Sequence, residues 1–114
     1  MLARQHRLTG KAEYKRVQDK GSVFQSKNFG IAIYNREDKN PTRFGFVVST
    51  KIARAAVDRN LSRRKLSEAV RTSMTNVKDG FDAAFLAKPS ITRVPTDEIM
   101  REVKVALQDS GLLK

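Results

Sequence analysis

Residues 43–49 read RFGFVVS, residues 58–77 read DRNLSRRKLSEAVRTSMTNV, and residues 81–87 read FDAAFLA. In the first segment apolar side chains recur at every second position, which is typical of a strand with one buried face. The second segment contains neither Pro nor Gly and predicts the longest helix of the chain, ended by Asp79-Gly80. The third segment is another strand candidate, so the stretch predicts a strand–helix–strand crossover. General rules make such a crossover right-handed.

Segments on either side add two helices and two strands. The expected elements are helices from a Thr9 cap to Lys20 and from a Thr96 cap to Gly111, and strands at residues 22–25 and 29–34. The resulting order αβββαβα predicts an α+β fold, a single-domain α/β sandwich over residues 1–114 with one four-stranded sheet.

The second of these strands has one bulky face and one small face. Phe29, Ile31 and Ile33 alternate with Gly30 and Ala32. The bulky face is expected to pack against helices. The small face suits close approach of a nucleic-acid strand, and it suits equally a covering helix that needs small residues beneath it. The sequence leaves both interpretations open.

The composition excludes several classes of site. The 114 residues include no cysteine and one histidine, which excludes thiolate zinc sites, cysteine nucleophiles and nearly every His-based triad. No apolar stretch approaches the roughly 20 residues needed to span a bilayer, so no membrane partner is expected. The charged N-terminal segment lacks the apolar run of a secretory signal, which favours a cytoplasmic location.

The chain is strongly basic, and the charge is unevenly distributed. Lys and Arg number 23 against 12 Asp and Glu, a net charge of +11. Residues 51–71 hold seven basic side chains against two acidic ones, and residues 1–20 hold six against two, whereas residues 96–114 are slightly acidic. Localised basic blocks indicate a polyanionic partner. Nucleic acid is favoured over a membrane because no basic helix carries a bulky apolar face.

Placed at 100° per residue, the predicted long helix has a packing face around Leu66, Ala69 and Val70 and a basic face around Arg63 and Arg64. A solvated helix would intersperse Glu at i,i+4 to pair with Arg, but most guanidiniums here lack such a neighbour and are available to bind phosphates bidentately. An ordinary charged solvent face is the alternative. The candidate RNA-binding residues are Lys51, Arg54, Arg59, Asn60, Arg63, Arg64, Lys65 and Arg71.

The run STKIARAAVDRNLSRRKLSE, residues 49–68, resembles the signature of the bacterial ribonuclease P protein subunit, in which an Arg-Asn pair and a basic pair open a helix. HRLTGKAEYKRVQDKG resembles that family's first helix, and GFDAAFLAKPS resembles its Gly-aromatic-Asp strand with the basic-Pro turn that follows. The copy departs from the family pattern at Thr50, Leu61, Ser67 and Gln18.

This resemblance implies an accessory role in RNA catalysis. In the family a large catalytic RNA, using magnesium at its own active site, removes the 5′ leader of precursor tRNA. The protein binds that RNA and holds the single-stranded leader between its first helix and its sheet. No cofactor bound by the protein, no catalytic side chain and no small-molecule substrate are expected. The resemblance also implies a left-handed crossover, against the general rule.

The candidate leader-binding residues lie mainly on the first predicted helix, where an aromatic beside lysines can stack on unpaired bases. They are Lys11, Tyr14, Lys15, Gln18 and Tyr34. For Tyr14 the alternative is core packing with its hydroxyl at the rim. For the whole chain, the alternatives are a ribosomal-protein-like or chaperone-like binder of structured RNA, and a protein nuclease. The nuclease is disfavoured by the missing His and metal-ligand clusters.

Overall fold

Residues 2–114, which the computed structural model describes, form three α-helices and one mixed four-stranded sheet with the strand order β1–β2–β4–β3. The strands are β1 (Ser22–Gln25), β2 (Phe29–Asn35), β3 (Arg43–Val47) and β4 (Phe81–Ala87). The helices are α1 (Lys11–Lys20), α2 (Ala56–Ser73) and α3 (Thr96–Asp109), with 3-10 turns η1 (Arg4–His6), η2 (Met74–Asn76) and η3 (Pro89–Arg93). The predicted element order and the α+β class are confirmed.

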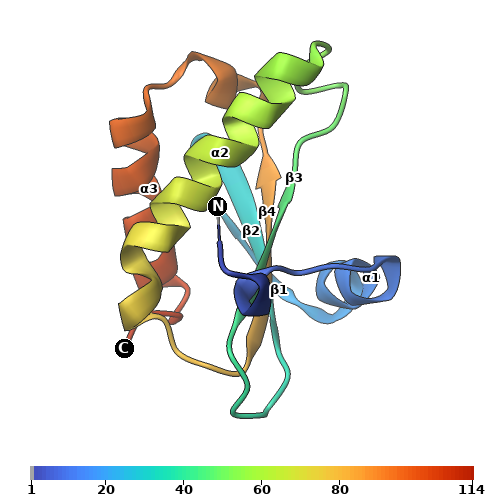
Figure 1. The fold of residues 1–114 in the computed structure, drawn as a ribbon, viewed down its shortest axis with the longest axis vertical. Helices are drawn as coiled ribbons and strands as arrows, with labels where there is room; N and C mark the ends of the chain where they lie inside the picture. Colours follow the sequence, from blue (N-terminus) through green and yellow to red (C-terminus); the bar gives the residue numbers. More distant parts are fainter. Residues whose placement is uncertain (1) are drawn as a thin grey trace.

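The crossover joins β3 to β4 through α2. The two strands are adjacent and parallel, with Phe44 opposite Ala83 and Phe46 opposite Phe85. With these strands pointing upward, β3 lies in front of β4 and α2 lies to their left (Figure 1), which makes the crossover left-handed. The right-handed expectation from general rules is therefore wrong for this chain, and the hand implied by the resemblance is correct.

The main core lies between the sheet and the pair of helices α2 and α3, which cover one face (Figure 1). Phe85 lies at its centre, with the ring centroids of Phe29, Phe46 and Phe44 at 5.3, 5.6 and 6.2 Å. The helices contribute the fully buried Leu66, Val70, Ile99, Val103 and Leu107. Burying each such side chain stabilises the fold by roughly 1.5–3 kcal/mol. This packing fixes the rotation of α2 and turns its basic side away from the core.

Helix α1 covers the opposite face of the sheet (Figure 1). Val17 and Leu8 pack there on Ala32 and Ala84. Gly45 of β3 lies directly under α1, because a Cβ at that position would come within 2.2 Å of the Tyr14 hydroxyl oxygen. Ala32, Ala84 and Gly45 therefore make room for the covering helix, as one of the two interpretations expects, whereas the neighbour of Gly30 is the Gln25 side chain of β1.

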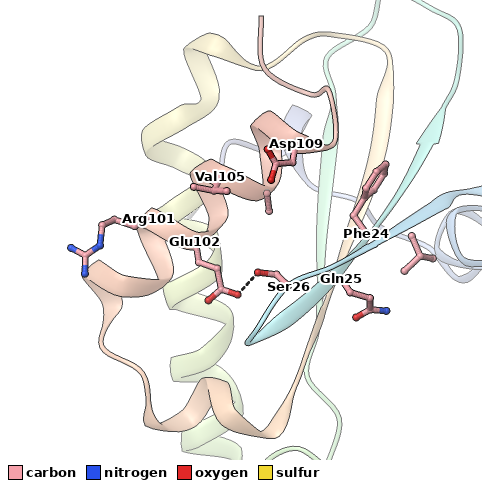
Figure 2. Close-up of a pocket in the computed structure, with 9 residues that line it drawn as sticks. Phe24, Gln25, Ser26, Arg101, Glu102, Val105 and Asp109 are labelled. Carbon is pink, nitrogen blue, oxygen red and sulfur yellow. Dashed lines mark hydrogen bonds between the residues drawn. The ribbon is translucent and has the colours of Figure 1, made fainter.

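Glu102 of α3 fastens that helix to the β1–β2 hairpin (Figure 2). Its carboxylate accepts hydrogen bonds from the Asn28 backbone N–H at 2.9 Å, from Asn28 Nδ2 at 2.6 Å and from the Ser26 hydroxyl. Asn28 is almost fully buried, so these bonds satisfy donors that have lost contact with water. They fix the position of α3 beside β1.

Both predicted helix caps are wrong by one residue. Helix α1 begins at Lys11 with Gly10 as its N-cap at φ 89°, and α3 begins at Thr96 with Pro95 as its N-cap. Neither N-cap forms a side-chain hydrogen bond to its helix. At Gly10 the chain enters the helix from a positive φ that favours glycine, which displaces the start past Thr9.

Candidate nucleic-acid interface

A groove of about 560 Å³ lies where α1, the edge strand β3 and α2 meet. Phe44, Gly45 and Phe46 of β3 line it, with residues from α1 and the segment before it on one side and the basic side of α2 on the other. Four residues singled out by the sequence line this groove: Tyr14, Asn60, Arg63 and Arg64. The structure thus brings a predicted leader-binding residue together with three predicted RNA-binding residues.

Arg63 is held in place on the α2 side of the groove. Its guanidinium donates to Asn60 Oδ1 at 3.1 Å and to the Val48 carbonyl at 3.4 Å. A guanidinium has five N–H donors, so these bonds orient the group and leave donors for an anion. Arg64 beside it is exposed and lines the same groove. The pair is suited to phosphate oxygens, which guanidinium groups bind bidentately.

Tyr14 forms the α1 side of the groove, half-buried against the backbone of β3. Burial raises the pKa of its hydroxyl, while a hydrogen bond with the Phe46 backbone and the charge of Arg63 act in the opposite direction. The net pKa lies above the ordinary tyrosine value, so the ring is neutral at physiological pH. The ring rests on Gly45, and its remaining surface lines the groove, where an unpaired base can stack on it.

The loop between β3 and α2 carries two further predicted RNA-binding residues, Lys51 and Arg54, both exposed. Arg59 holds this loop, since its Nη1 donates to the carbonyl oxygens of Ala53 at 3.0 Å and Arg54 at 2.7 Å. Arg59 is therefore placed to position the loop cations as well as to add its own charge to the basic surface.

Lys65 and Arg71 have protein partners in addition to their predicted role. Lys65 Nζ donates to the carbonyl oxygens of Ile91 at 3.3 Å and Val94 at 2.8 Å, at and just after η3. Arg71 pairs with Glu68 at 2.8 Å, and its hydrogen bond lowers the pKa of that carboxyl. The expected lack of acidic neighbours therefore fits the groove-lining arginines but not Arg71.

The remaining candidates for leader binding lie outside the groove. Lys11, Lys15 and Gln18 are exposed on α1. Tyr34 lies near the end of β2, where the Arg16 guanidinium carbon is 4.9 Å from its ring centroid. The structure therefore does not bring Tyr34 to the groove that Tyr14 lines.

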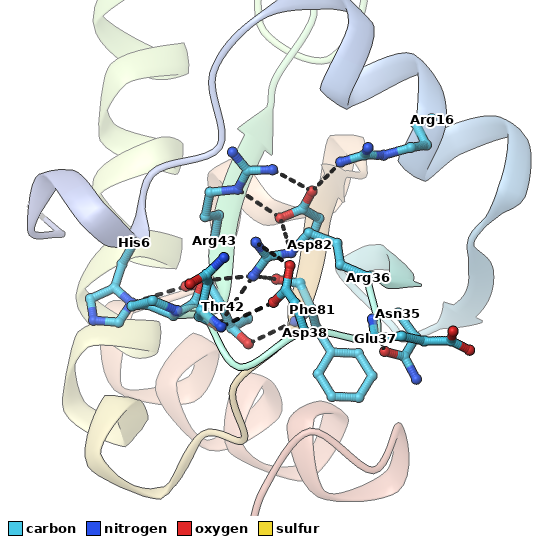
Figure 3. A network of polar contacts seen from close by, with 12 residues as sticks. His6, Arg16, Asn35, Arg36, Glu37, Asp38, Thr42, Arg43, Phe81 and Asp82 are labelled. Carbon is cyan, nitrogen blue, oxygen red and sulfur yellow. Dashed lines mark hydrogen bonds and ion pairs between the residues drawn. The ribbon is translucent and has the colours of Figure 1, made fainter.

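A buried ionic cluster fixes α1 to the sheet (Figure 3). Asp82 of β4 is fully buried and accepts two hydrogen bonds from Arg43, Nε to Oδ1 and Nη2 to Oδ2, both at 2.8 Å. Arg16 of α1 reaches Oδ2 at 3.1 Å, and Arg36 Nε lies 3.3 Å from Oδ1. Burial acts to raise the pKa of Asp82, but the hydrogen bonds and charges of the arginines outweigh it, so the net pKa lies below its usual value.

Sequence reasoning assigned no role to this cluster. The available signal was the single carboxylate inside the apolar run FDAAFLA, because an ionised side chain in a buried strand requires cationic partners. The sequence could not predict which cations these would be, because Arg16, Arg36 and Arg43 come from three separate segments of the chain.

A metal site and a membrane-spanning helix are both absent from the described part of the chain. Among residues 2–114, no three His, Asp or Glu side chains are grouped so that they could hold a metal ion. Within the same residues, no helix is both long enough and apolar enough to cross a membrane.

Comparison with known proteins gives one consistent result. The family model described as Ribonuclease P matches residues 2–111. The ribonuclease P protein component of Clavibacter michiganensis is 31% identical over 94% of each chain, and that of Symbiobacterium thermophilum is 26% identical over 99% of this chain and 97% of its own. Among solved structures, the Staphylococcus aureus RNase P protein superposes with a TM-score of 0.86 at 21% identity, covering 96% of this chain and 98% of its own. The Thermotoga maritima RNase P protein gives 0.81 at 20% identity, covering 90% of this chain and 96% of its own.

Proposed function

Because the chain belongs to the ribonuclease P protein family, we propose that it binds the catalytic RNA of ribonuclease P and the 5′ leader of precursor tRNA, and so supports removal of that leader. The observation that carries this proposal is the groove in which Tyr14 faces the Arg63–Arg64 side of α2. An aromatic platform beside fixed guanidiniums is suited to a single strand, whose bases stack and whose phosphates need cations.

The rest of the basic surface provides binding to a folded RNA. Lys51 and Arg54 on the loop between β3 and α2 are exposed, and so is Arg64, which lines the groove. Each phosphate that such a cation neutralises releases condensed counterions, so affinity falls steeply with salt. When the protein neutralises phosphate charges, it also replaces part of the screening that divalent cations otherwise provide to a large RNA. We therefore expect the protein to lower the magnesium concentration at which the RNA cleaves.

We assign the cleavage chemistry to the RNA. The magnesium ions expected in the reaction belong to the RNA active site, and the protein's own residues bind and orient the strands. The chain has one histidine, His6, whose Nδ1 lies 2.9 Å from the Thr42 carbonyl oxygen. That contact gives the imidazole a structural partner in the β2–β3 loop, and His6 is not among the residues that line the groove.

The direct test is cleavage of precursor tRNA by a bacterial ribonuclease P RNA at low magnesium, with and without this protein. We expect correct 5′ cleavage only when both are present, and no cleavage by the protein alone. Cleavage by the protein alone would instead favour a protein nuclease.

The competing function is a binder of structured RNA with no part in cleavage. A subunit should increase the affinity of the catalytic RNA for precursor tRNA more than for mature tRNA, because the mature form lacks the leader. A general RNA binder should increase both affinities equally or neither. Equal effects with the cognate RNA would favour the competing function.

A further inference from the structure

Strand β1 leaves one edge of the sheet open. In the antiparallel ladder with β2, the Ser26 N–H bonds the Phe29 carbonyl at 2.8 Å, and backbone groups alternate between the two edges from there. The N–H and C=O groups of Phe24 therefore point toward β2, whereas those of Val23 and Gln25 point outward. Within residues 2–114, the strand that pairs with β1 is β2. Two residues thus present unpaired backbone donors and acceptors to the surroundings.

The two edges of the sheet are protected differently. At the β3 edge, the Leu8 N–H donates to the Phe44 carbonyl at 2.9 Å, so the segment before α1 covers part of it. Strand β1 reads SVFQ and contains none of the Lys or Pro residues that commonly prevent pairing at an edge. The β1 edge is therefore open to another strand.

An apolar groove of about 610 Å³ lies beside this edge, between β1 and α3 (Figure 2). Val23 is 51% exposed, Phe24 37% and Val105 of α3 53%. Phe24 lies opposite Ile31 of the main core, so its side chain points to the α3 face beside Val105, whereas Val23 lies opposite Ala32 and its side chain points to the α1 face. An exposed phenylalanine and an exposed valine side by side at an open sheet edge indicate a protein-binding site.

The charges along the groove are symmetric about its centre. Arg101, Val105 and Asp109 of α3 line the groove at successive four-residue steps, so the two opposite charges lie equally far on either side of Val105. Two such helices packed antiparallel about Val105 would place each Arg101 opposite the other helix's Asp109. This surface is therefore complementary to itself. The α3 side of this surface belongs to the slightly acidic segment of residues 96–114.

We propose that two copies of this chain pair through β1, antiparallel and centred on Phe24, to form one continuous sheet. Val23 of each copy then exchanges backbone hydrogen bonds with the partner's Gln25, and the reciprocal pair forms across the two-fold axis. The two α3 helices lie side by side on the same face, with Phe24 and Val105 of both copies filling the groove. The groove lined by Tyr14 and α2 is formed by other elements and stays accessible.

Two features set the strength of this dimer. The paired strands are four residues long, so the interface is small and the association is weak. Each copy carries a net charge of +11, so repulsion opposes association at low ionic strength. Salt screens that repulsion, and the dimer should therefore strengthen with salt, whereas binding to RNA phosphates weakens.

Cross-linking tests the register. Position 24 faces itself across the axis in a non-hydrogen-bonded pair, where Cα atoms lie about 4.5 Å apart, within the range of a disulfide. The chain has no cysteine, so Phe24→Cys provides a single thiol. The matched control is Val57→Cys on α2, 68% exposed and far from the groove in sequence and structure. We expect Phe24→Cys to form disulfide-linked dimers in high salt many times faster than the control. Equal rates overturn the proposed register.

Sedimentation equilibrium tests the interface without a new thiol. In high salt the wild-type chain should approach twice the monomer mass as its concentration rises, and Val105→Glu should remain monomeric while Val57→Glu still dimerises. Arg101→Asp and Asp109→Arg should each weaken the dimer, and the double variant should restore it. Circular dichroism and melting of each variant exclude unfolding. A wild-type chain that stays monomeric up to millimolar concentration, or a dimer indifferent to Val105→Glu, overturns the proposal.

Discussion

Replacing Asp82 by Asn tests whether the buried cluster holds α1 on the sheet. Arg43, Arg36 and Arg16 all approach this carboxylate, so the amide would leave three guanidiniums without their shared counter-charge. Removing one partner of a buried ionic group costs roughly 3–5 kcal/mol. Arg16 and Arg43 are 37% and 28% exposed and keep part of their hydration, so we expect about 3 kcal/mol, the lower end of that range. This corresponds to a fall in Tm of roughly 10–20 °C.

The same cluster predicts how the loss depends on pH. The pKa of Asp82 is lower in the folded state than its usual value, so its charge stabilises the fold above the unfolded-state pKa of about 3.9. That contribution is lost as the pH falls through the lower, folded-state pKa. The neutral Asn variant has no such contribution to lose. The stability gap between wild type and Asp82→Asn should therefore be full near pH 7 and shrink below pH ~4.

Urea unfolding at pH 7 and at pH 3 measures both effects. Asp79→Asn is the control, because Asp79 is an exposed aspartate three residues before Asp82 in the chain. The control should change the free energy of unfolding by less than about 0.5 kcal/mol at either pH, as is usual for surface substitutions. Equal stability of wild type and Asp82→Asn at pH 7, or a gap that does not depend on pH, would refute the reasoning.

Three further predictions concern the proposed RNA interface. Reversing Arg63 and Arg64 to Glu should abolish binding to the catalytic RNA while the circular dichroism spectrum and Tm stay close to wild type; retained binding in a filter or mobility assay would contradict the role of this helix side. Tyr14→Ala should weaken binding of precursor tRNA by the assembled complex by ~1–3 kcal/mol, the value of one stacked base, and leave mature tRNA unaffected, as measured by fluorescence titration. Lys65→Met should lower the free energy of unfolding by about 1 kcal/mol, because its hydrogen bonds to carbonyl oxygens are lost. Arg64→Met should reduce the slope of log binding constant against log salt concentration by about 0.7–0.9, and Lys65→Met should reduce that slope less.

The helices and strands could be predicted from the sequence because buried side chains recur with the helical period of about 3.6 residues or the strand period of two. The wheel of the long helix placed Leu66 and Val70 on the packing face, and both are fully buried. The helix itself begins at Ala56, two residues earlier than expected, and gives way at Ser73 to a 3-10 turn. Those ends depend on how the chain enters from β3 and leaves toward β4, which local periodicity does not encode.

The sequence could not show how the site is assembled. Tyr14 and Arg63 lie 49 positions apart in the chain, and only the packing of α1 over Gly45 brings them to one groove. The sequence also gave no way to tell a cation directed to solvent from one bonded to the protein. Lys65 and Arg64 are neighbours in sequence, yet Lys65 binds carbonyl oxygens at η3 while Arg64 lines the groove.

Leader-dependent affinity tests the central claim most directly. The equilibrium constants for precursor and mature tRNA are measured on the cognate catalytic RNA, with and without the protein, and again with Tyr14→Ala. The account predicts that the wild-type protein raises the affinity for precursor tRNA selectively and that Tyr14→Ala removes much of this selectivity while still binding the RNA. Equal affinity changes for precursor and mature tRNA, or full selectivity in Tyr14→Ala, would contradict the assignment of the leader to this groove.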